Sequence, residues 1–343
     1  MHERFQKAKR RLRSCGAACF GLLLALSLAT GQAAAADGET PRMLTPVGHT
    51  MGIKLFSRGV LVVGLTPGKT PARSGGLETG DVILQCNGTA ITSSEQFQTL
   101  LRSAEGETLA LQVGRNSDRT TVTVRPEQNE QGDWAIGAWI RDSMAGIGTM
   151  TYYDPASGIF GALGHGVTDT DTACLMPFAS GSILPSAVKA VKRGEPGSAG
   201  ELRGEFQLTT DLGGLFANTD RGIFGRLASA EYLPPQAEAL PVAPAAEVTD
   251  GPAVIRSNVA GEEVRDYAVE ITRLSPGGND PRQLLVTVTD PALLAATGGI
   301  VQGMSGSPII QDGKLVGAVT HVLLNDPTRG YGIFIENMLE AAE

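Results

Sequence analysis

The sequence predicts a mainly β protein with room for two compact domains. Of its 343 residues, 42% are hydrophobic and 19% are charged, and 44 are glycine. Aromatic residues are few, and valine, threonine and glycine recur in short runs in which apolar and polar residues alternate. Such alternation is typical of strands with one buried face. The length and the apolar fraction are sufficient for two hydrophobic cores.

Charge and cysteine content exclude several classes of function. The net charge is −8, which provides no basic surface for DNA or RNA. Two of the four cysteines lie near the N-terminus, and the remaining two, Cys86 and Cys174, have no spacing that indicates a metal site or a disulfide framework. We therefore expect no nucleic acid, no metal and no cofactor.

The N-terminal residues 1–36 predict an export signal. Six Lys and Arg residues between Arg4 and Arg13 precede an apolar run from Cys15 to about Leu28. This run is marginal for a membrane-spanning helix, which needs about 20 residues, and Ala33–Ala36 would suit a signal peptidase. A cleaved signal peptide and a retained membrane anchor both stay open. In either case the following residues are translocated, first through a polar linker at 37–46.

Residues 47–127 predict a small β domain with one capped helix. Gly80-Asp81 opens a strand, Asn87-Gly88 is a tight hairpin turn, and Ser93 or Ser94 can cap the helix that follows. The run from Pro71 to Ile91 resembles the bacterial PDZ domain. That resemblance implies a site for an extended peptide, which such domains add as a strand beside a carboxylate-binding turn.

The resemblance also implies where the peptide would bind. The segment Thr50-Met51-Gly52-Ile53 would form the carboxylate-binding turn, opposite the helix that carries Phe97 and Leu100. The alternative is that the domain is a spacer without a free ligand.

Residues 128–343 contain a motif for a nucleophilic serine, Gly303-Met304-Ser305-Gly306-Ser307-Pro308. Attack on a peptide carbonyl creates an oxyanion that needs two convergent N–H groups, and glycines allow the tight turn that supplies them. We expect Ser305 to be the nucleophile, and the N–H groups of Gly303 and Ser305 to form the oxyanion hole. An inert turn rich in glycine and serine is the alternative.

Histidine is the expected base. Of the four histidines, His2 lies in the export segment, which leaves His49, His165 and His321. Glycines on both sides of His165 make it a poor core residue, so we favour it as the base. Asp290, at the end of an alternating strand, is the candidate orienting acid, with Asp169 and Asp171 as alternatives. A triad is defined by geometry, so the residues alone do not choose among these acids.

A longer resemblance covers these residues. The runs 289–294, 297–310, 317–322 and 325–328, together with Gly164–Asp169 and the domain in front, resemble the SpoIVB peptidase family, named for stage IV sporulation protein B. The resemblance implies a serine endopeptidase with a chymotrypsin-like double β-barrel and a triad of His165, Asp290 and Ser305.

Two features depart from ordinary trypsin-like enzymes. Met304 replaces the aspartate that usually precedes the serine, which argues against activation by a new N-terminus that pairs with that aspartate. Asp290 lies only 305 − 290 = 15 residues before Ser305.

His321 is a candidate for the specificity pocket. It lies after Ser305 on a strand that commonly walls this pocket in the chymotrypsin-like architecture, although a core histidine is the alternative.

The resemblance further implies a biological setting. It implies self-cleavage near the N-terminus and cleavage of SpoIVFA, the regulatory subunit that restrains a membrane metalloprotease processing pro-sigma-K. The site of action would be the space between the forespore and mother-cell membranes. Two alternatives stay open: an HtrA-type quality-control protease, in which the PDZ domain follows the peptidase, and a PDZ adaptor with a degenerate peptidase fold.

Overall fold

The computed structural model describes residues 41–343 except 208, 234–237 and 275–279. The predicted export segment and the first residues of the predicted linker lie outside this part. Among the described residues, no helix combines the length and apolar composition needed to span a bilayer.

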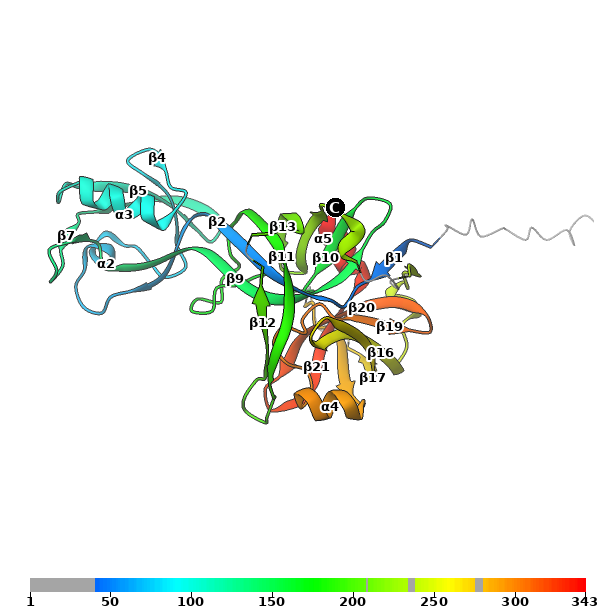
Figure 1. Cartoon of the computed structure of the whole chain (residues 1–343). Coiled ribbons are helices and arrows are strands. Elements are labelled where there is room, and N and C mark those ends of the chain that lie inside the picture. Colours follow the sequence, from blue (N-terminus) through cyan, green and yellow to red (C-terminus); the bar gives the residue numbers. More distant parts are fainter. Residues whose placement is uncertain (1–40, 208, 234–237, 275–279) are drawn as a thin grey trace, which may run out of the picture. The chain divides into compact units, whose positions relative to one another are not determined.

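Six antiparallel strands close into a first barrel (Figure 1). The pairings run β9–β10–β14–β13–β11–β2 and return from β2 to β9. Apolar side chains that include Met51, Met150, Phe160 and Ile183 fill its core. The strands are β2 (Thr50–Leu65), β9 (Ala138–Tyr153), β10 (Ile159–Ala162), β11 (Phe178–Lys192), β13 (Gly213–Thr219) and β14 (Gly222–Leu227).

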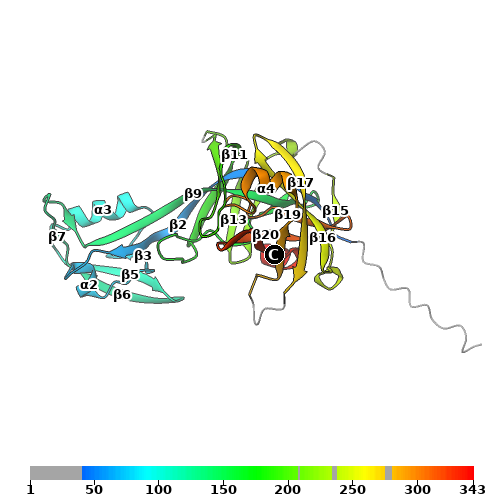
Figure 2. The ribbon, with the colours of Figure 1, turned by 90° about the horizontal axis from the view of Figure 1, so that it is seen from below.

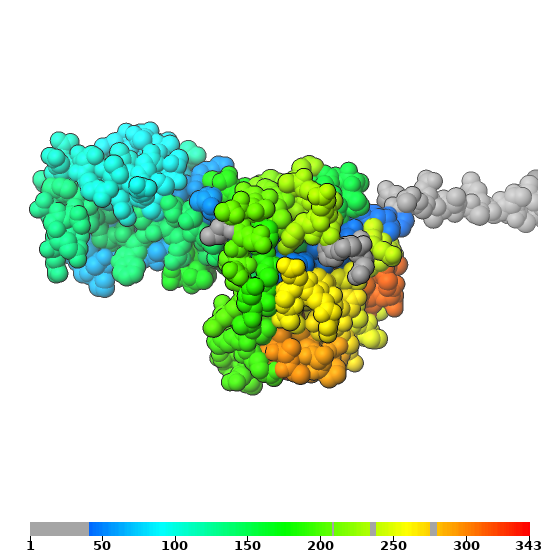
Figure 3. Space-filling view, viewed as in Figure 1, coloured from blue at the N-terminus to red at the C-terminus, as the bar shows by residue number. Residues whose placement is uncertain are grey.

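A second closed barrel follows in the order β16–β17–β18–β21–β20–β19. Its core contains Ile255, Val286, Met304 and Ile309, and two helices, α4 (Pro291–Thr297) and α5 (Ile335–Ala342), accompany it. Residues of the two barrels are in contact over the visible face (Figure 3). The expected mainly β fold with two barrels is confirmed. The strands are β16 (Gly251–Ala260), β17 (Glu263–Arg273), β18 (Leu284–Val288), β19 (Pro308–Gln311), β20 (Lys314–Leu323) and β21 (Asp326–Phe334).

The predicted PDZ domain is built largely as its turn chemistry indicates. Asn87 and Gly88 have positive φ values of 48° and 79° in the hairpin turn, and the Ser93 hydroxyl accepts from Gln96 N–H at the start of α3. Phe97 lies in the apolar core. The elements are α2 (Pro71–Gly75), β3 (Val82–Cys86), β4 (Thr89–Ala90), α3 (Ser94–Ser103), β5 (Leu109–Arg115) and β6 (Asp118–Val124).

Short elements complete the chain and correct the predicted linker. Met43–Pro46, expected to be linker, forms β1, which pairs with Tyr152 and Tyr153 of β9. Its other neighbour is β15 (Leu240–Pro241). The remaining elements are β7 (Glu127–Gln128), β8 (Trp134–Ala135), β12 (Glu201–Phe206) and the 3-10 turns Ala230–Tyr232 and Ala245–Glu247.

The largest departure from the sequence prediction is β2. It is one strand of 16 residues, whose first half pairs with β9 on one side and β11 on the other, inside the first barrel. The predicted carboxylate-binding turn at Thr50–Ile53 is therefore wrong: the segment is extended, and Met51 and Ile53 are buried. The chain leaves the barrel along β2, forms the predicted PDZ domain and returns along β9. Residues 50–56, which fall within the expected PDZ range 47–127, therefore belong to the barrel.

Two glycines of β2 test this arrangement. A Cβ at Gly52 would stand 2.6 Å from the Phe206 ring, whereas a Cβ at Gly64 would have nothing within 4 Å. We expect Gly52→Ala to lower the free energy of unfolding by about 1–3 kcal/mol through overpacking. The matched variant Gly64→Ala should change it by less than about 1 kcal/mol. Urea unfolding measures the free energy of unfolding of both variants. An equal decrease in the two would contradict the position of Gly52 inside the barrel.

Candidate active site

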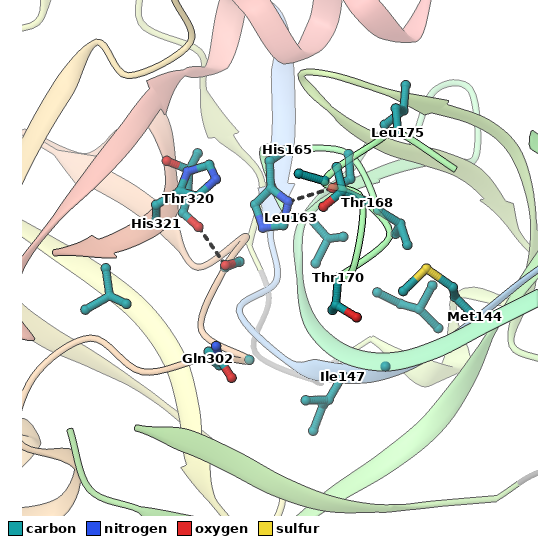
Figure 4. A pocket seen from close by; sticks show the side chains of 18 of the residues that line it. Met144, Ile147, Leu163, His165, Thr168, Thr170, Leu175, Gln302, Thr320 and His321 are labelled. Carbon is teal, nitrogen blue, oxygen red and sulfur yellow. Dashed lines mark hydrogen bonds between the residues drawn. The ribbon is translucent and has the colours of Figure 1, made fainter. Parts of the chain in front are cut away.

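A cleft of ≈ 690 Å³ brings residues of both barrels together (Figure 4). The first barrel contributes part of β9, Met144–Ile147, and the loop that follows β10, from Leu163. The second barrel contributes the loop before β19, Ile300–Ser305, and Thr320–Val322 of β20. Ser305, His165 and His321 all line this cleft, so the structure brings together the predicted nucleophile, the predicted base and the predicted pocket residue.

The Ser305 loop is a tight turn locked against the first barrel. A Cβ at Gly306, where φ is +96°, would stand 2.0 Å from the Thr149 carbonyl oxygen, so only glycine fits. The Ser305 hydroxyl is half-buried and donates to the Thr320 carbonyl at 2.7 Å. To react, the hydroxyl must rotate from this carbonyl toward His165, since catalytic hydrogen bonds often form only when substrate is bound.

The predicted oxyanion-hole donors are free in this loop. The N–H groups of Met304 and Gly306 donate to the carbonyls of Val301 and Val319. Within the described part of the chain, those of Gly303 and Ser305 have no acceptor. Their carbonyls point the other way: Gly303 O accepts from Thr149 Oγ1 at 2.8 Å, and Ser305 O from Thr149 N–H at 2.9 Å. Two donors are thereby left for a developing oxyanion.

His165 has the tautomer that a general base needs. Its Nδ1 lies 2.8 Å from the Gly166 carbonyl oxygen, which can only accept, so Nδ1 carries the proton and Nε2 is left to accept one. Burial lowers the pKa of His165, against a smaller raising effect of the Gly166 hydrogen bond. The imidazole is therefore neutral at pH 7 and able to take the proton of a serine hydroxyl.

His321 lies beside His165, with ring centroids 4.9 Å apart. It is exposed in the cleft, so the alternative of a core histidine is wrong. Burial, and then the repulsion that the His165 ring would exert if both imidazoles were protonated, lower the pKa of His321. Its role as a specificity residue stays a prediction.

Asp290 lies elsewhere in the second barrel. Its carboxylate caps helix α4, accepting from the N–H groups of Ala292 and Leu293 at 2.9 and 3.0 Å, and it does not line the cleft. In this structure the group bonded to His165 is therefore a carbonyl and not Asp290. An aspartate followed by proline and an apolar run is also the sequence signature of a helix N-terminus.

The two alternative acids and the third histidine also form hydrogen bonds with groups other than His165 and Ser305. Asp169 is buried and accepts from Arg141 and from Thr172, and Asp171 accepts from the same Arg141. His49 bonds to the Thr50 carbonyl and does not line the cleft. One carboxylate that does line it, Asp220, was not predicted, because a turn between two strands gives it no distinguishing pattern.

The two barrels and the residues of their common cleft indicate the class of protein. Two β-barrels with a glycine-flanked serine, a neutral histidine and two free N–H donors in their common cleft are the machinery of a serine peptidase.

Comparison with known families gives the particular family. Residues 132–339 match the family SpoIVB peptidase S55, and residues 41–125 match the PDZ domain family. The chain belongs to the SpoIVB peptidase S55 family and is a serine peptidase with a PDZ domain. A Clostridium perfringens protein, whose name assigns it provisionally to the zinc metalloproteases, is 35% identical over 68 residues. That match spans 20% of this chain and 20% of the relative.

Solved structures show more limited similarity. PDZ domains of SdrC-like proteins from Listeria monocytogenes and Listeria innocua are each 24% identical, with a TM-score of 0.23. They match 24% of this chain and 87% and 93% of their own chains. The HtrA-type protease AlgW, solved with a decapeptide, is 8% identical with a TM-score of 0.35, covering 87% of this chain and 64% of its own.

Substitution of Asp290 distinguishes a helix cap from a triad member. Asparagine caps as well as aspartate, so we expect Asp290→Asn to keep stability and to retain peptidase activity within about tenfold of wild type. Ser305→Ala and His165→Ala should each lose on the order of 10⁴-fold or more. The rates are measured on one peptide substrate. A loss of about 10⁴-fold in Asp290→Asn would make it the orienting acid.

Thr149 should act as a positioning residue for the oxyanion hole. Thr149→Val keeps the side-chain shape but leaves the buried Gly303 carbonyl without its donor, which costs about 1–3 kcal/mol. We expect kcat to fall about 10- to 100-fold with little change in KM, because the lost order affects the transition state. Thr149→Ser, which retains the hydroxyl, is the matched control and should recover most of kcat. A purely structural role would give equal kcat for the folded variants.

Proposed function

We propose that this protein is an exported, self-cleaving serine endopeptidase of the sporulation signalling type. Its substrate would be a membrane-associated regulatory protein of the SpoIVFA kind, whose cleavage triggers pro-sigma-K processing. The observation that carries the peptidase part of this proposal is the cleft that Ser305 and neutral His165 both line, where two backbone N–H groups of the serine loop have no acceptor among the described residues. Membership of the SpoIVB family supports the signalling part.

The residues of the cleft account for peptide-bond hydrolysis. Ser305 Oγ attacks the scissile carbonyl while His165 Nε2 takes its proton, and the Gly303 and Ser305 N–H groups stabilise the oxyanion. The tetrahedral intermediate then collapses as His165 returns the proton to the leaving amine. A water molecule repeats the same steps on the acyl-enzyme. The Gly166 carbonyl keeps the ring oriented throughout.

The place of action follows from the N-terminal segment and the PDZ domain. The basic and then apolar residues 1–28 favour export across the cytoplasmic membrane, with the segment removed or kept as an anchor. We propose the forespore intermembrane space as the compartment and the PDZ domain as the holder of a protein partner. A general HtrA-type protease is less favoured, because here the PDZ domain is inserted before the catalytic residues and does not follow them. The cleft geometry speaks against a non-catalytic adaptor.

Two measurements separate the parts of this proposal. A fluorophosphonate probe should label the wild-type chain and leave Ser305→Ala blank, which tests the peptidase. Co-expression with a SpoIVFA-like protein should yield a discrete fragment and a shortened N-terminus of the peptidase, both lost in Ser305→Ala. Labelling without either cleavage would retain the enzyme and reject the signalling substrate. An unlabelled, folded wild-type protein would favour the adaptor.

A further inference from the structure

We propose that Arg141 of β9 is a positioning residue for the general base, and that it acts through the buried carboxylate of Asp169. An ion pair joins the two side chains. Asp169 follows His165 on the base loop, which we define as residues 163–177 between β10 and β11. The inference deepens the proposed peptidase function and rests on it, because Arg141 has this role only if His165 is the base.

The base loop contains a small hairpin that the Asp169 carboxylate organises. Thr168 and Leu175 form an antiparallel β-bridge across it. In the turn, Asp169 Oδ1 accepts from Asp171 N–H at 3.1 Å. The same oxygen accepts from the N–H and the hydroxyl of Thr172 at 2.9 and 3.0 Å. These bonds use one carboxylate oxygen, so Oδ2 is left for a partner outside the loop.

Arg141 is that partner, and it attaches the hairpin to β9. Its guanidinium donates to Asp169 Oδ2, and to the Asp171 carboxylate at 2.8 Å. The side chain of Asp169 is fully buried, whereas that of Asp171 is 54% exposed. Burial by itself would raise the pKa of Asp169, but its bonds to Thr172 and Arg141 hold this pKa below the ordinary value. A buried charge needs its partner far more than an exposed one, so we expect Asp169 to carry the effect.

Arg141 lies on the two-stranded stem that joins the first barrel to the PDZ domain. Figure 2 shows β2 and β9 side by side in this stem, where Arg141 pairs with Leu61 of β2. The next residue, Asp142, points to the opposite side of the strand. There its carboxylate accepts from Ser94 N–H, at the start of α3, at 2.8 Å. Two consecutive residues of β9 therefore hold the base loop and the PDZ helix.

Apolar contacts pack the base loop against the same stem. Met176 of the loop forms a small core with Leu55 and Leu61 of β2. Val82, from β3 of the PDZ domain, packs against this core. The stem and the PDZ domain thus help to set the position of the base loop, and Arg141 is the charged contact among these apolar ones.

A displaced loop would misplace the base. The Gly166 carbonyl, which orients the His165 ring, belongs to the same loop, so the ring and its acceptor move together. Ser305 lies on the loop before β19 of the second barrel and would not follow them. A misplacement of about 1 Å in an active site can cost on the order of 10²-fold in rate. Loss of Arg141 should therefore slow the chemical step and leave binding unchanged.

Inactivation by a fluorophosphonate tests the proposal on the full chain. In this reaction Ser305 Oγ bonds to phosphorus, fluoride leaves, and His165 takes the hydroxyl proton, so the rate reports the position of the base. The rate constant of inactivation, kinact, and the probe's dissociation constant, KI, are measured separately. We expect Arg141→Gln to lower kinact about 10- to 100-fold and to keep KI within about twofold. Asp169→Asn should give a loss of the same size.

Three further variants separate positioning from general damage. Arg141→Lys returns the positive charge and should recover most of kinact, although it lacks the forked geometry of Arg141. Asp171→Asn removes only the exposed partner and should keep kinact within about twofold. The double variant Arg141→Gln/Asp169→Asn should lose no more than either single variant, because both changes remove one interaction.

Several results would overturn the inference: wild-type kinact in folded Arg141→Gln, a loss in KI alone, a loss that Arg141→Lys does not reduce, an equal loss in Asp171→Asn, or additive losses in the double variant. Near-ultraviolet circular dichroism checks the fold of each variant. Failure of both Arg141→Gln and Asp169→Asn to fold would assign the ion pair to stability and reject positioning. A folded wild type that does not react would reject the proposed peptidase itself, whereas a reactive wild type with unchanged variants would reject this inference alone.

Discussion

The antiparallel pairing of β2 with β9 is the interaction on which the rest of the structure depends. It closes the first barrel through residues 50–56 and joins the PDZ domain to the barrel through residues 61–65. β9 also supplies Thr149, whose N–H and hydroxyl hold the carbonyls of Ser305 and Gly303. The loop that carries the predicted oxyanion-hole donors of the second barrel is therefore held by a strand of the first, so the shape of the candidate site depends on the packing of the two barrels.

The site uses backbone groups where other serine peptidases use side chains. A carbonyl, and not a carboxylate, fixes the tautomer of His165. It orients the ring but offers less electrostatic stabilisation to the imidazolium that forms during attack. Burial, which already lowers the pKa of His165, adds to that cost. Met304, in place of the usual aspartate, is fully buried in the second core and packs the nucleophile loop through apolar contact.

Local patterns predicted the parts of the site that depend on local chemistry. The Ser305 turn requires glycine at positive φ, His165 stands in a glycine-flanked loop, and Asn87-Gly88 and Ser93 form the turn and the cap that their side chains favour. In each case the residues that determine the conformation lie within a few positions of one another. The candidate nucleophile, the candidate base and the turns of the PDZ domain could accordingly be located from the sequence alone.

The residues alone were enough to predict the two-barrel peptidase class and the presence of a PDZ domain, and to single out Ser305 and His165, which the fold brings into one cleft. Only the tertiary structure decided where β2 belongs, because an extended run such as Thr50–Phe56 fits any sheet edge, and its partners lie about 90 and 130 residues away in β9 and β11. The tertiary structure also decided the partners of Asp290. The N–H groups at the start of α4, which have no acceptor within the helix, donate to the Asp290 carboxylate and hold it away from the cleft.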